Sequence, residues 1–205
     1  MSDEPMHVEV CKMRKWLSKK VFVRIGLISV FVVFMAIGCA TATKEFDPNI
    51  QGPQMIVEPE TIRLGVARVM KTQFLFKGKG FQPQDSVFIE LMGVNQKDQT
   101  VDIPIFDGEV DNNGSFTIKT KPGYDPTGLT FKIGVLLRAK TGTNEKGETT
   151  IVVTQPPIPE GVYTVRAVSM ESDKTAESKL VIKGPSVLDR LKDWIGEKMG
   201  KIQRK

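Results

Sequence analysis

The sequence is poor in the residues on which most catalytic and metal sites depend. It has one histidine, His7, and two cysteines, Cys11 and Cys39. Beyond Cys39 it has neither, so that part lacks the usual zinc ligands, the usual general base and any internal disulfide. A Gly-x-Ser-x-Gly nucleophile turn and a phosphate-binding glycine loop are also missing. We therefore expect a protein that is not an enzyme and needs no cofactor.

An excess of positive over negative charge is lacking over most of the chain, although the formal net charge is +5. Six basic and three acidic residues precede Cys39, which leaves a balance of only +2 for the remainder. Aromatic residues make up 7% of the chain, and no stripe of Lys and Arg interleaved with aromatics is present. This composition does not indicate binding to nucleic acid.

Long hydrophobic runs are also lacking, and the main one is short. Residues 25–38 carry no charge, and Lys19, Lys20 and Arg24 lie just before them. Basic residues, an apolar stretch and small residues in this order are typical of a secretory signal. A plain membrane anchor over residues 21–40 is the alternative, but the uncharged stretch is short for a span.

The end of this run, Ala-Ile-Gly-Cys at 36–39, resembles the lipobox of bacterial lipoproteins. That family prefers leucine where Ala36 stands. The resemblance implies that residues 1–38 are removed, that Cys39 carries diacylglycerol and often an acylated amine, and that the chain is anchored to the membrane of a bacterial cell envelope. Ala40 resembles the class sent to the outer membrane, if the host has two membranes.

Composition divides the chain into four segments. Residues 1–38 form the signal, and we expect translation to start at Met13, which opens the basic stretch MRKWLSKK. Residues 39–54 hold the lipidated cysteine and a flexible tether, because they contain Pro and Gly and no apolar period. Residues 55–183 are the globular part, and residues 184–205 form an amphipathic helix.

The globular part contains short β-rich runs separated by turn residues. Such runs, with no long helical period, predict an antiparallel sandwich or barrel. In one of them Tyr163, Val165 and Ala167 share a face, the pattern of a half-buried strand. The expected strands cover residues 55–58, 72–76, 86–91, 100–106, 115–120, 130–137, 149–154, 162–169 and 178–183.

Four stretches in order, FKGKGFQPQDSVFIEL, VDNNGSFTI, PEGVYTVRAV and AESKLVI, carry turn motifs. Together they resemble bacterial Ig-like domains of the IPT/TIG type over residues 55–183. The resemblance implies an all-β fold, an Ig-like antiparallel β-sandwich. Residues 121–150 exceed the usual length of the family, which predicts an inserted hairpin. The hydroxyl of Tyr163 is expected to hydrogen-bond back to a loop as a tyrosine corner.

Two loops carry candidate ligand sites. The acidic stretch DGEVDNNGSF suggests calcium, but an EF-hand-like loop needs an acid at its twelfth position, and counting from Glu109 that position is Thr120. A solvated hairpin tip is the simpler interpretation. Tyr124 lies in a Pro/Gly loop and is a weak candidate for stacking on a sugar ring. More often such a residue lies flat over its own sheet.

The C-terminal segment predicts a helix with one apolar stripe. Ser186 and Asp189 form a start that resembles a capping box. Gly196 and Gly200 weaken a helix interior, so this helix needs a surface against which to bury its stripe. The stripe, a candidate partner or membrane face, comprises Leu188, Leu191, Trp194, Ile195, Met199 and Ile202.

Three surfaces compete for this stripe: the protein's own sandwich, a protein partner and the membrane. The membrane comes last because an Ig-like sandwich tends to place its two ends apart. The expected function is that of an envelope lipoprotein with a non-catalytic binding or scaffolding role through protein–protein contacts. The membrane, through Cys39, and an envelope protein are the expected partners. A glycan-binding surface module and an accessory subunit of an envelope machine are the alternatives.

Overall fold

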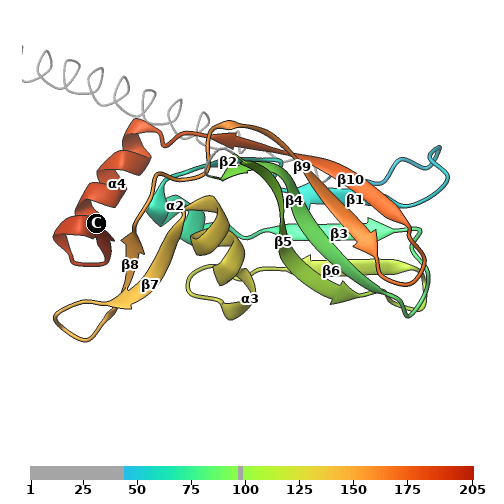
Figure 1. Ribbon diagram of the computed structural model, residues 1–205, viewed down its shortest axis with the longest axis horizontal. Helices are drawn as coiled ribbons and strands as arrows, with labels where there is room; N and C mark the ends of the chain where they lie inside the picture. The colour runs from blue at the N-terminus through green and yellow to red at the C-terminus, as the bar shows by residue number, and fades with distance from the viewer. Residues whose placement is uncertain (1–43, 97–98) are drawn as a thin grey trace, which may run out of the picture. The chain divides into compact units, whose positions relative to one another are not determined.

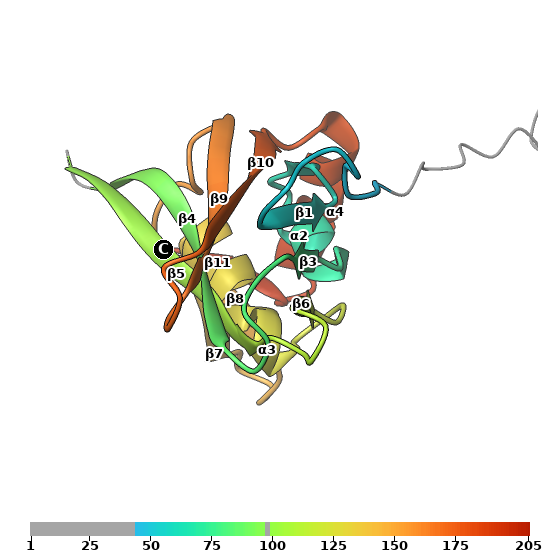
Figure 2. The same ribbon diagram turned by 90° about the vertical axis from the view of Figure 1, so that its right-hand side faces the viewer.

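Two sheets face each other in the described part of the computed structural model, residues 44–96 and 99–205 (Figures 1 and 2). The expected signal segment and Cys39 lie outside these residues. One sheet has the order β1 (Gln54–Glu58), β3 (Leu75–Lys79), β6 (Ser115–Lys119). The other has the order β2 (Thr61–Arg63), β10 (Thr175–Lys183), β9 (Gly161–Ser169), β4 (Ser86–Gln96), β5 (Gln99–Glu109). Figure 2 shows β9, β4 and β5 in one layer and β1, β3 and β6 in the other.

The expectation of a mostly β fold with a C-terminal helix is confirmed, and the strands of the described residues form three sheets. The expectation that all strands run antiparallel is wrong at two places. Strand β2 pairs parallel with β10, and the last strand, β11 (Ile202–Arg204), pairs parallel with β8 (Thr149–Val153). Both β2 and β11 are short strands at a sheet edge.

Aromatic rings fill the space between the sheets. The ring centroid of Phe131 lies 4.9 Å from that of Phe74 and 5.6 Å from that of Phe106, in edge-on arrangements. The alternate residues Tyr163, Val165 and Ala167 of β9 are buried, as their pattern predicts. Edge-on aromatic pairs and alternating burial together hold the two layers against each other.

The segment between β6 and β9 contains a hairpin formed by β7 (Ala139–Thr143) and β8, which overlaps the insertion predicted at residues 121–150 and takes the strand expected at 149–154 as its second strand. Before it, however, the chain forms helix α3 (Pro126–Leu129) and a π-helical segment, η1 (Thr130–Leu136). The strand expected at 130–137 is therefore wrong. A continuous apolar run does not distinguish a strand from a buried helical turn, and here the packing of Phe131 among the core rings favours the helical form.

The C-terminal helix α4 (Val187–Lys198) ends sooner than the sequence predicts. Gly200 adopts a positive φ of 70°. Its N–H donates to Glu197 O at 3.0 Å, and Lys201 N–H donates to Gly196 O at 2.9 Å. These are the bonds of a Schellman motif, which ends a helix at a left-handed residue.

Ile202 is consequently not part of the helical stripe. It lies in β11, 5% exposed, paired with Ile151 of β8. It also packs on α4, since a Cβ on Gly196 would come within 2.7 Å of its Cδ1 atom. The prediction that Ile202 belongs to the partner or membrane face is therefore wrong, because the chain reverses at Gly200.

Figure 1 shows α4 and the β7–β8 hairpin at one end of the facing sheets, with helix α2 (Val66–Lys71) beside them. The expected tether is not free of the domain in its described part, residues 44–54, whose last residue opens strand β1. Gln54 Nε2 donates to Asp47 O at 2.9 Å, and Lys79 Nζ lies 5.1 Å from the ring centroid of Phe46. Among the described residues, no helix has the length and apolar character needed to cross a membrane.

Candidate functional site

Helix α4 begins with the capping box that the sequence predicts. Ser186 Oγ accepts a hydrogen bond from Asp189 N–H at 3.2 Å, and Asp189 Oδ2 accepts one from Ser186 N–H at 3.0 Å. Two of the N–H groups left free at a helix start are satisfied in this way. The prediction is confirmed, with aspartate in the position where glutamate is usual.

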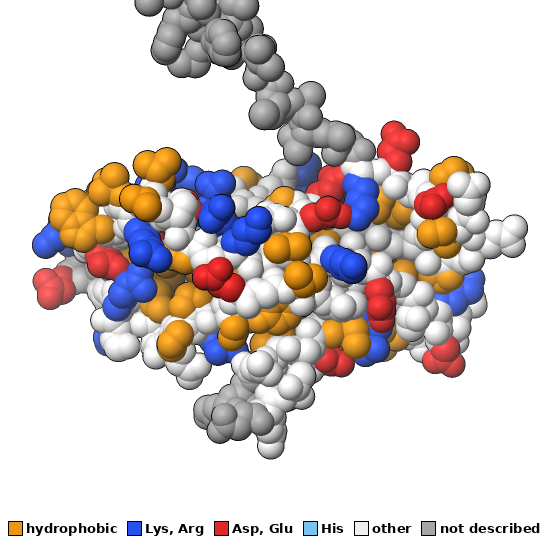
Figure 3. Space-filling model, turned by 90° about the horizontal axis from the view of Figure 1, so that it is seen from above, with side chains coloured by type: hydrophobic (Ala, Val, Ile, Leu, Met, Phe, Trp, Pro, Cys, Tyr) orange, Lys and Arg blue, Asp and Glu red, His pale blue; other side chains and the backbone are white. Residues whose placement is uncertain are grey.

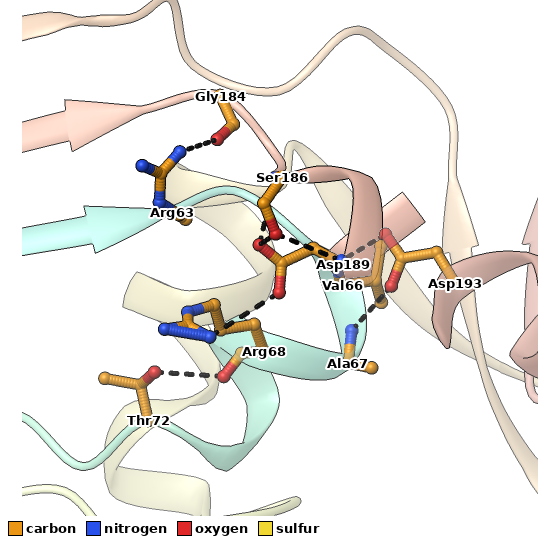
Figure 4. Close-up of polar contacts among 9 residues, drawn as sticks. All are labelled: Arg63, Val66, Ala67, Arg68, Thr72, Gly184, Ser186, Asp189 and Asp193. Atoms are coloured by element: carbon orange, nitrogen blue, oxygen red, sulfur yellow. Dashed lines mark hydrogen bonds and ion pairs between the residues drawn. The ribbon is translucent and has the colours of Figure 1, made fainter. Parts of the chain in front are cut away.

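The polar face of α4 is the one that contacts the domain (Figure 4). Asp193 is 4% exposed, and its Oδ2 and Oδ1 accept hydrogen bonds from Val66 N–H and Ala67 N–H, each at 2.9 Å. These two N–H groups belong to the first two residues of helix α2. The N-cap residue of α2, Gly65, has no side chain that could accept their hydrogen bonds. A carboxylate from α4 thus caps α2 and also matches the positive end of its dipole.

Asp189 makes the second contact of this face. It is 1% exposed, and its Oδ1 lies 3.6 Å from Arg68 Nη1 of α2. Burial by itself raises the pKa of Asp189, but the hydrogen bonds from Ser186 and the positive charges of Arg68 and Lys192 outweigh it. The pKa of Asp189 is therefore held below its ordinary value of 3.8, and the carboxylate stays ionised at neutral pH.

The apolar face of α4 points away from the domain. Six side chains on it are between 44% and 82% exposed: Val187, Leu188, Leu191, Trp194, Ile195 and Met199. With 3.6 residues per turn, they lie on the side of the helix opposite Asp189 and Asp193. We call these six residues the outward stripe. Figure 3 shows apolar side chains gathered over α4, with basic side chains among them.

Of the three surfaces that compete for the stripe in the sequence analysis, its exposure disfavours the protein's own sandwich. Asp193 accepts two hydrogen bonds from α2 and Asp189 forms an ion pair with Arg68 of α2, whereas the six apolar side chains of the stripe are exposed. Five of the six residues that the sequence predicts for the stripe lie together on this exposed face, and Ile202 is the exception.

Two hollows flank α4. The first, of about 420 Å³, is lined in part by apolar residues, among them Leu64, Val66, Ile158 and Trp194. The second, of about 370 Å³, is basic: Lys192 of α4 and Arg68 and Lys71 of α2 line it. The outward stripe therefore lies between two hollows, one lined in part by apolar residues and one lined by three basic residues.

Neither of the two loop candidates lines a hollow beside α4. Tyr124 is 45% exposed, and burial of its remaining surface raises the pKa of its hydroxyl. No second exposed aromatic ring pairs with it in the described residues. In the acidic loop, Asp111 Oδ1 accepts hydrogen bonds from Asn113 N–H and Ser115 N–H, at 2.8 and 2.9 Å. The part of the chain that the structure describes contains no group of three potential metal ligands.

The predicted tyrosine corner is present. Tyr163 Oη donates to Pro159 O at 2.9 Å, so this hydroxyl holds the loop before β9. The pairing of Asp193 with α2 was not predicted. A usable signal exists in the sequence, since Asp189 and Asp193 lie four residues apart and so share the helix face opposite the stripe.

No family model and no curated protein matches this sequence. Among solved structures, macromomycin is similar at a TM-score of 0.34 and 13% identity, over 64% of this chain and 99% of its own. A β-glucosidase from Listeria innocua reaches 0.35 and 11%, over 66% of this chain. The β-glucosidase EmGH1 from Erythrobacter marinus reaches 0.34 and 9%, over 64%. The matches cover only 16% and 15% of the two glucosidase chains. At these scores the likenesses carry no conclusion about function.

Proposed function

We propose that this protein is a lipoprotein of a bacterial cell envelope, anchored through Cys39, with a non-catalytic binding or scaffolding role. Where the host has two membranes, the lipobox-like sequence and Ala40 support the outer membrane as its place. Protein–protein contacts are the first form of this role, within an envelope assembly or with a single partner. Binding of a glycan through Tyr124 is the weaker alternative, because one exposed ring offers little stacking surface.

The arrangement of strands supports an Ig-like domain of the IPT/TIG type. The sheet β1–β3–β6 faces the sheet β2–β10–β9–β4–β5, so the first two strands lie in different sheets. The turn at Asn113-Gly114 leads into β6, and Tyr163 holds the loop before β9. Such a fold is shared by many unrelated binding proteins and specifies no ligand by itself.

The outward stripe is the observation that carries the proposed role. Six adjacent apolar side chains on one helix face, flanked by polar residues, form a contiguous exposed patch. Patches of this kind on soluble domains mark sites of contact with proteins or membranes. Since the inward face of α4 is firmly bound through Asp189 and Asp193, the helix holds this patch in a defined position.

The anchor is tested by labelling cells with radioactive palmitate. We expect the label in the wild-type protein, and we expect Cys39→Ala to prevent acylation and leave the precursor uncleaved. Cys11→Ala serves as the matched control and should behave like the wild type. Label in the Cys39→Ala protein would overturn the lipoprotein proposal.

The binding role is tested by crosslinking in intact cells. A partner that contacts the outward stripe should be lost with Leu191→Asp and retained with Met170→Asp, a substitution at a similarly exposed apolar residue in the β9–β10 turn. Equal crosslinking in the two variants would move the contact to another surface.

A further inference from the structure

We propose that the outward stripe of α4 docks on the surface of an anionic lipid bilayer, with the helix axis parallel to the membrane plane. This inference replaces a protein by a lipid surface as the first partner of the stripe, and it rests on the proposed function only for the presence of a membrane anchor near residue 39. In the sequence analysis the membrane ranks last among the three surfaces that compete for the stripe, and this inference places it first.

The distribution of charge on α4 favours an anionic surface. The negative charges of its three acidic residues are buried or paired. Asp189 and Asp193 are buried against α2, and Glu197 Oε1 accepts a hydrogen bond from Arg204 Nε at 2.5 Å. Its basic residues face outward. On the helical wheel Arg190 and Lys192 border opposite edges of the stripe, and both are exposed. The approaching partner therefore meets apolar groups with one positive charge at each edge.

Trp194 and Lys198 form a pair suited to a lipid interface. Lys198 Nζ lies 6.0 Å from the centroid of the Trp194 indole ring. An indole ring has an apolar body and a polar edge, and a lysine extends its ammonium toward the headgroups while its methylenes lie along the acyl chains. Lysine is depleted at the centres of protein–protein interfaces but enriched on helices that lie in the membrane surface. Lys198 within the stripe thus argues for lipid rather than for protein.

The basic hollow beside the stripe adds sites for headgroup phosphates. Arg68, Lys71 and Lys192 converge on it from two helices. Each basic residue near an anionic bilayer adds electrostatic attraction to the lipid surface. With α4 lying flat, this hollow would face the headgroup layer, next to the apolar residues inserted below it.

The start of the described chain lies close to the same hollow. The ammonium of Lys44 forms an ion pair with Glu60, whose neighbours Pro59 and Thr61 line the hollow together with Lys192. The described chain therefore begins near the hollow that Lys192 of α4 lines, whereas the sequence alone favours an anchored end far from α4. Cys39 precedes Lys44 by five residues, which span at most about 18 Å when fully extended. An acylated Cys39 and the outward stripe are able to reach one bilayer.

The test uses the whole chain reconstituted in lipid nanodiscs, where either an acylated Cys39 or an uncleaved anchor holds it. Discs of phosphatidylcholine with phosphatidylglycerol are compared with discs of phosphatidylcholine alone, both carrying brominated acyl chains that quench tryptophan. The chain has a second tryptophan, Trp16, which is retained if the signal segment is not removed. A Trp194→Phe variant measures the emission of Trp16, which is then subtracted. We expect strong quenching of Trp194 in the anionic discs, reduced by high salt, together with slowed amide exchange over residues 187–198.

Leu191→Asp should lower the docking equilibrium constant by about tenfold or more, since it removes a buried leucine and adds a charge. Met170→Asp should leave docking unchanged. Lys192→Glu should weaken docking in anionic discs, whereas Lys179→Glu on strand β10 should not.

Three results would overturn the proposal: unquenched Trp194 in anionic discs at low salt, quenching that Leu191→Asp does not alter, or equal quenching in the two lipid compositions. Crosslinks between two copies across the stripe, with Trp194 unquenched, would assign it to self-association. The lipid anchor at Cys39 is tested separately by palmitate labelling. Failure of the docking experiment would therefore leave the lipoprotein proposal intact.

Discussion

Asp193 joins two helices through a single carboxylate. Both of its oxygens accept hydrogen bonds from the first turn of α2. Asp193→Ala leaves those two N–H groups buried without acceptors, and we expect a loss of about 2 kcal/mol in the free energy of unfolding. Urea denaturation measures this. Asp193→Asn keeps one acceptor oxygen and should lose about half as much.

Lys192→Ala is the matched control on the same helix. Its side chain is exposed and caps nothing, so it should change stability by less than about 0.5 kcal/mol. If Asp193→Ala were equally mild, the bond between α4 and α2 would not be the contact that holds the helix.

The pKa of Asp189 sets a second residue-scale expectation. Because the folded-state pKa lies below the ordinary 3.8, the carboxylate contributes stability above that value and loses it as pH falls through the lower folded pKa. Asp189→Asn should therefore be less stable than the wild type at neutral pH. The difference should shrink as the pH drops below 3.8. Thermal melts of both proteins across acidic pH measure this, and a constant difference would contradict it.

At the scale of elements, the end of α4 depends on Gly200. A residue with a Cβ at its φ of 70° is strained, so Gly200→Ala should cost about 1–2 kcal/mol. Gly200→Asn should cost less, because asparagine tolerates the left-handed region. Gly134→Ala in η1 is the control, since a Cβ there meets nothing within 4 Å. A Gly200→Ala protein as stable as the wild type would show that the helix can continue past Lys198.

The same turn explains why the C-terminal segment holds two kinds of structure. Met199 remains on the exposed face of the helix, while Ile202, three residues later, is buried in β11. An uninterrupted helix would have kept both on one stripe. The reversal at Gly200 divides them, so only the residues up to Met199 are available for docking.

At the scale of the whole molecule, residues 184–205 belong to the fold. Strand β11 extends the β7–β8 sheet, and Asp193 caps α2. A chain of residues 44–183 should therefore melt well below a chain of residues 44–205, by more than the loss from Asp193→Ala alone. Differential scanning calorimetry of both chains makes the comparison. Equal melting temperatures would mean that the C-terminal segment is an independent attachment.

Contacts between residues close together in the chain leave patterns that the sequence alone reveals. The capping box of Ser186 and Asp189, the alternating pattern around Tyr163, and the turn at Asn113-Gly114 all rest on contacts within a few residues. Gly114 has a φ of 72°, a conformation that favours glycine. These local features are sufficient to predict most strands, the start of α4 and a mostly β domain.

The direction in which α4 turns its apolar stripe could not be read in this way. The spacing of apolar residues defines a face but not the surface that covers it. Here the choice depends on a carboxylate of Asp193 meeting the N–H groups of Val66 and Ala67, 127 and 126 residues away in the chain. Likewise, the run at 130–137 becomes helical because Phe131 packs among rings that come from both facing sheets. Contacts over such separations exist only once the chain has folded, and they decide that the apolar face of α4 is left open to a partner.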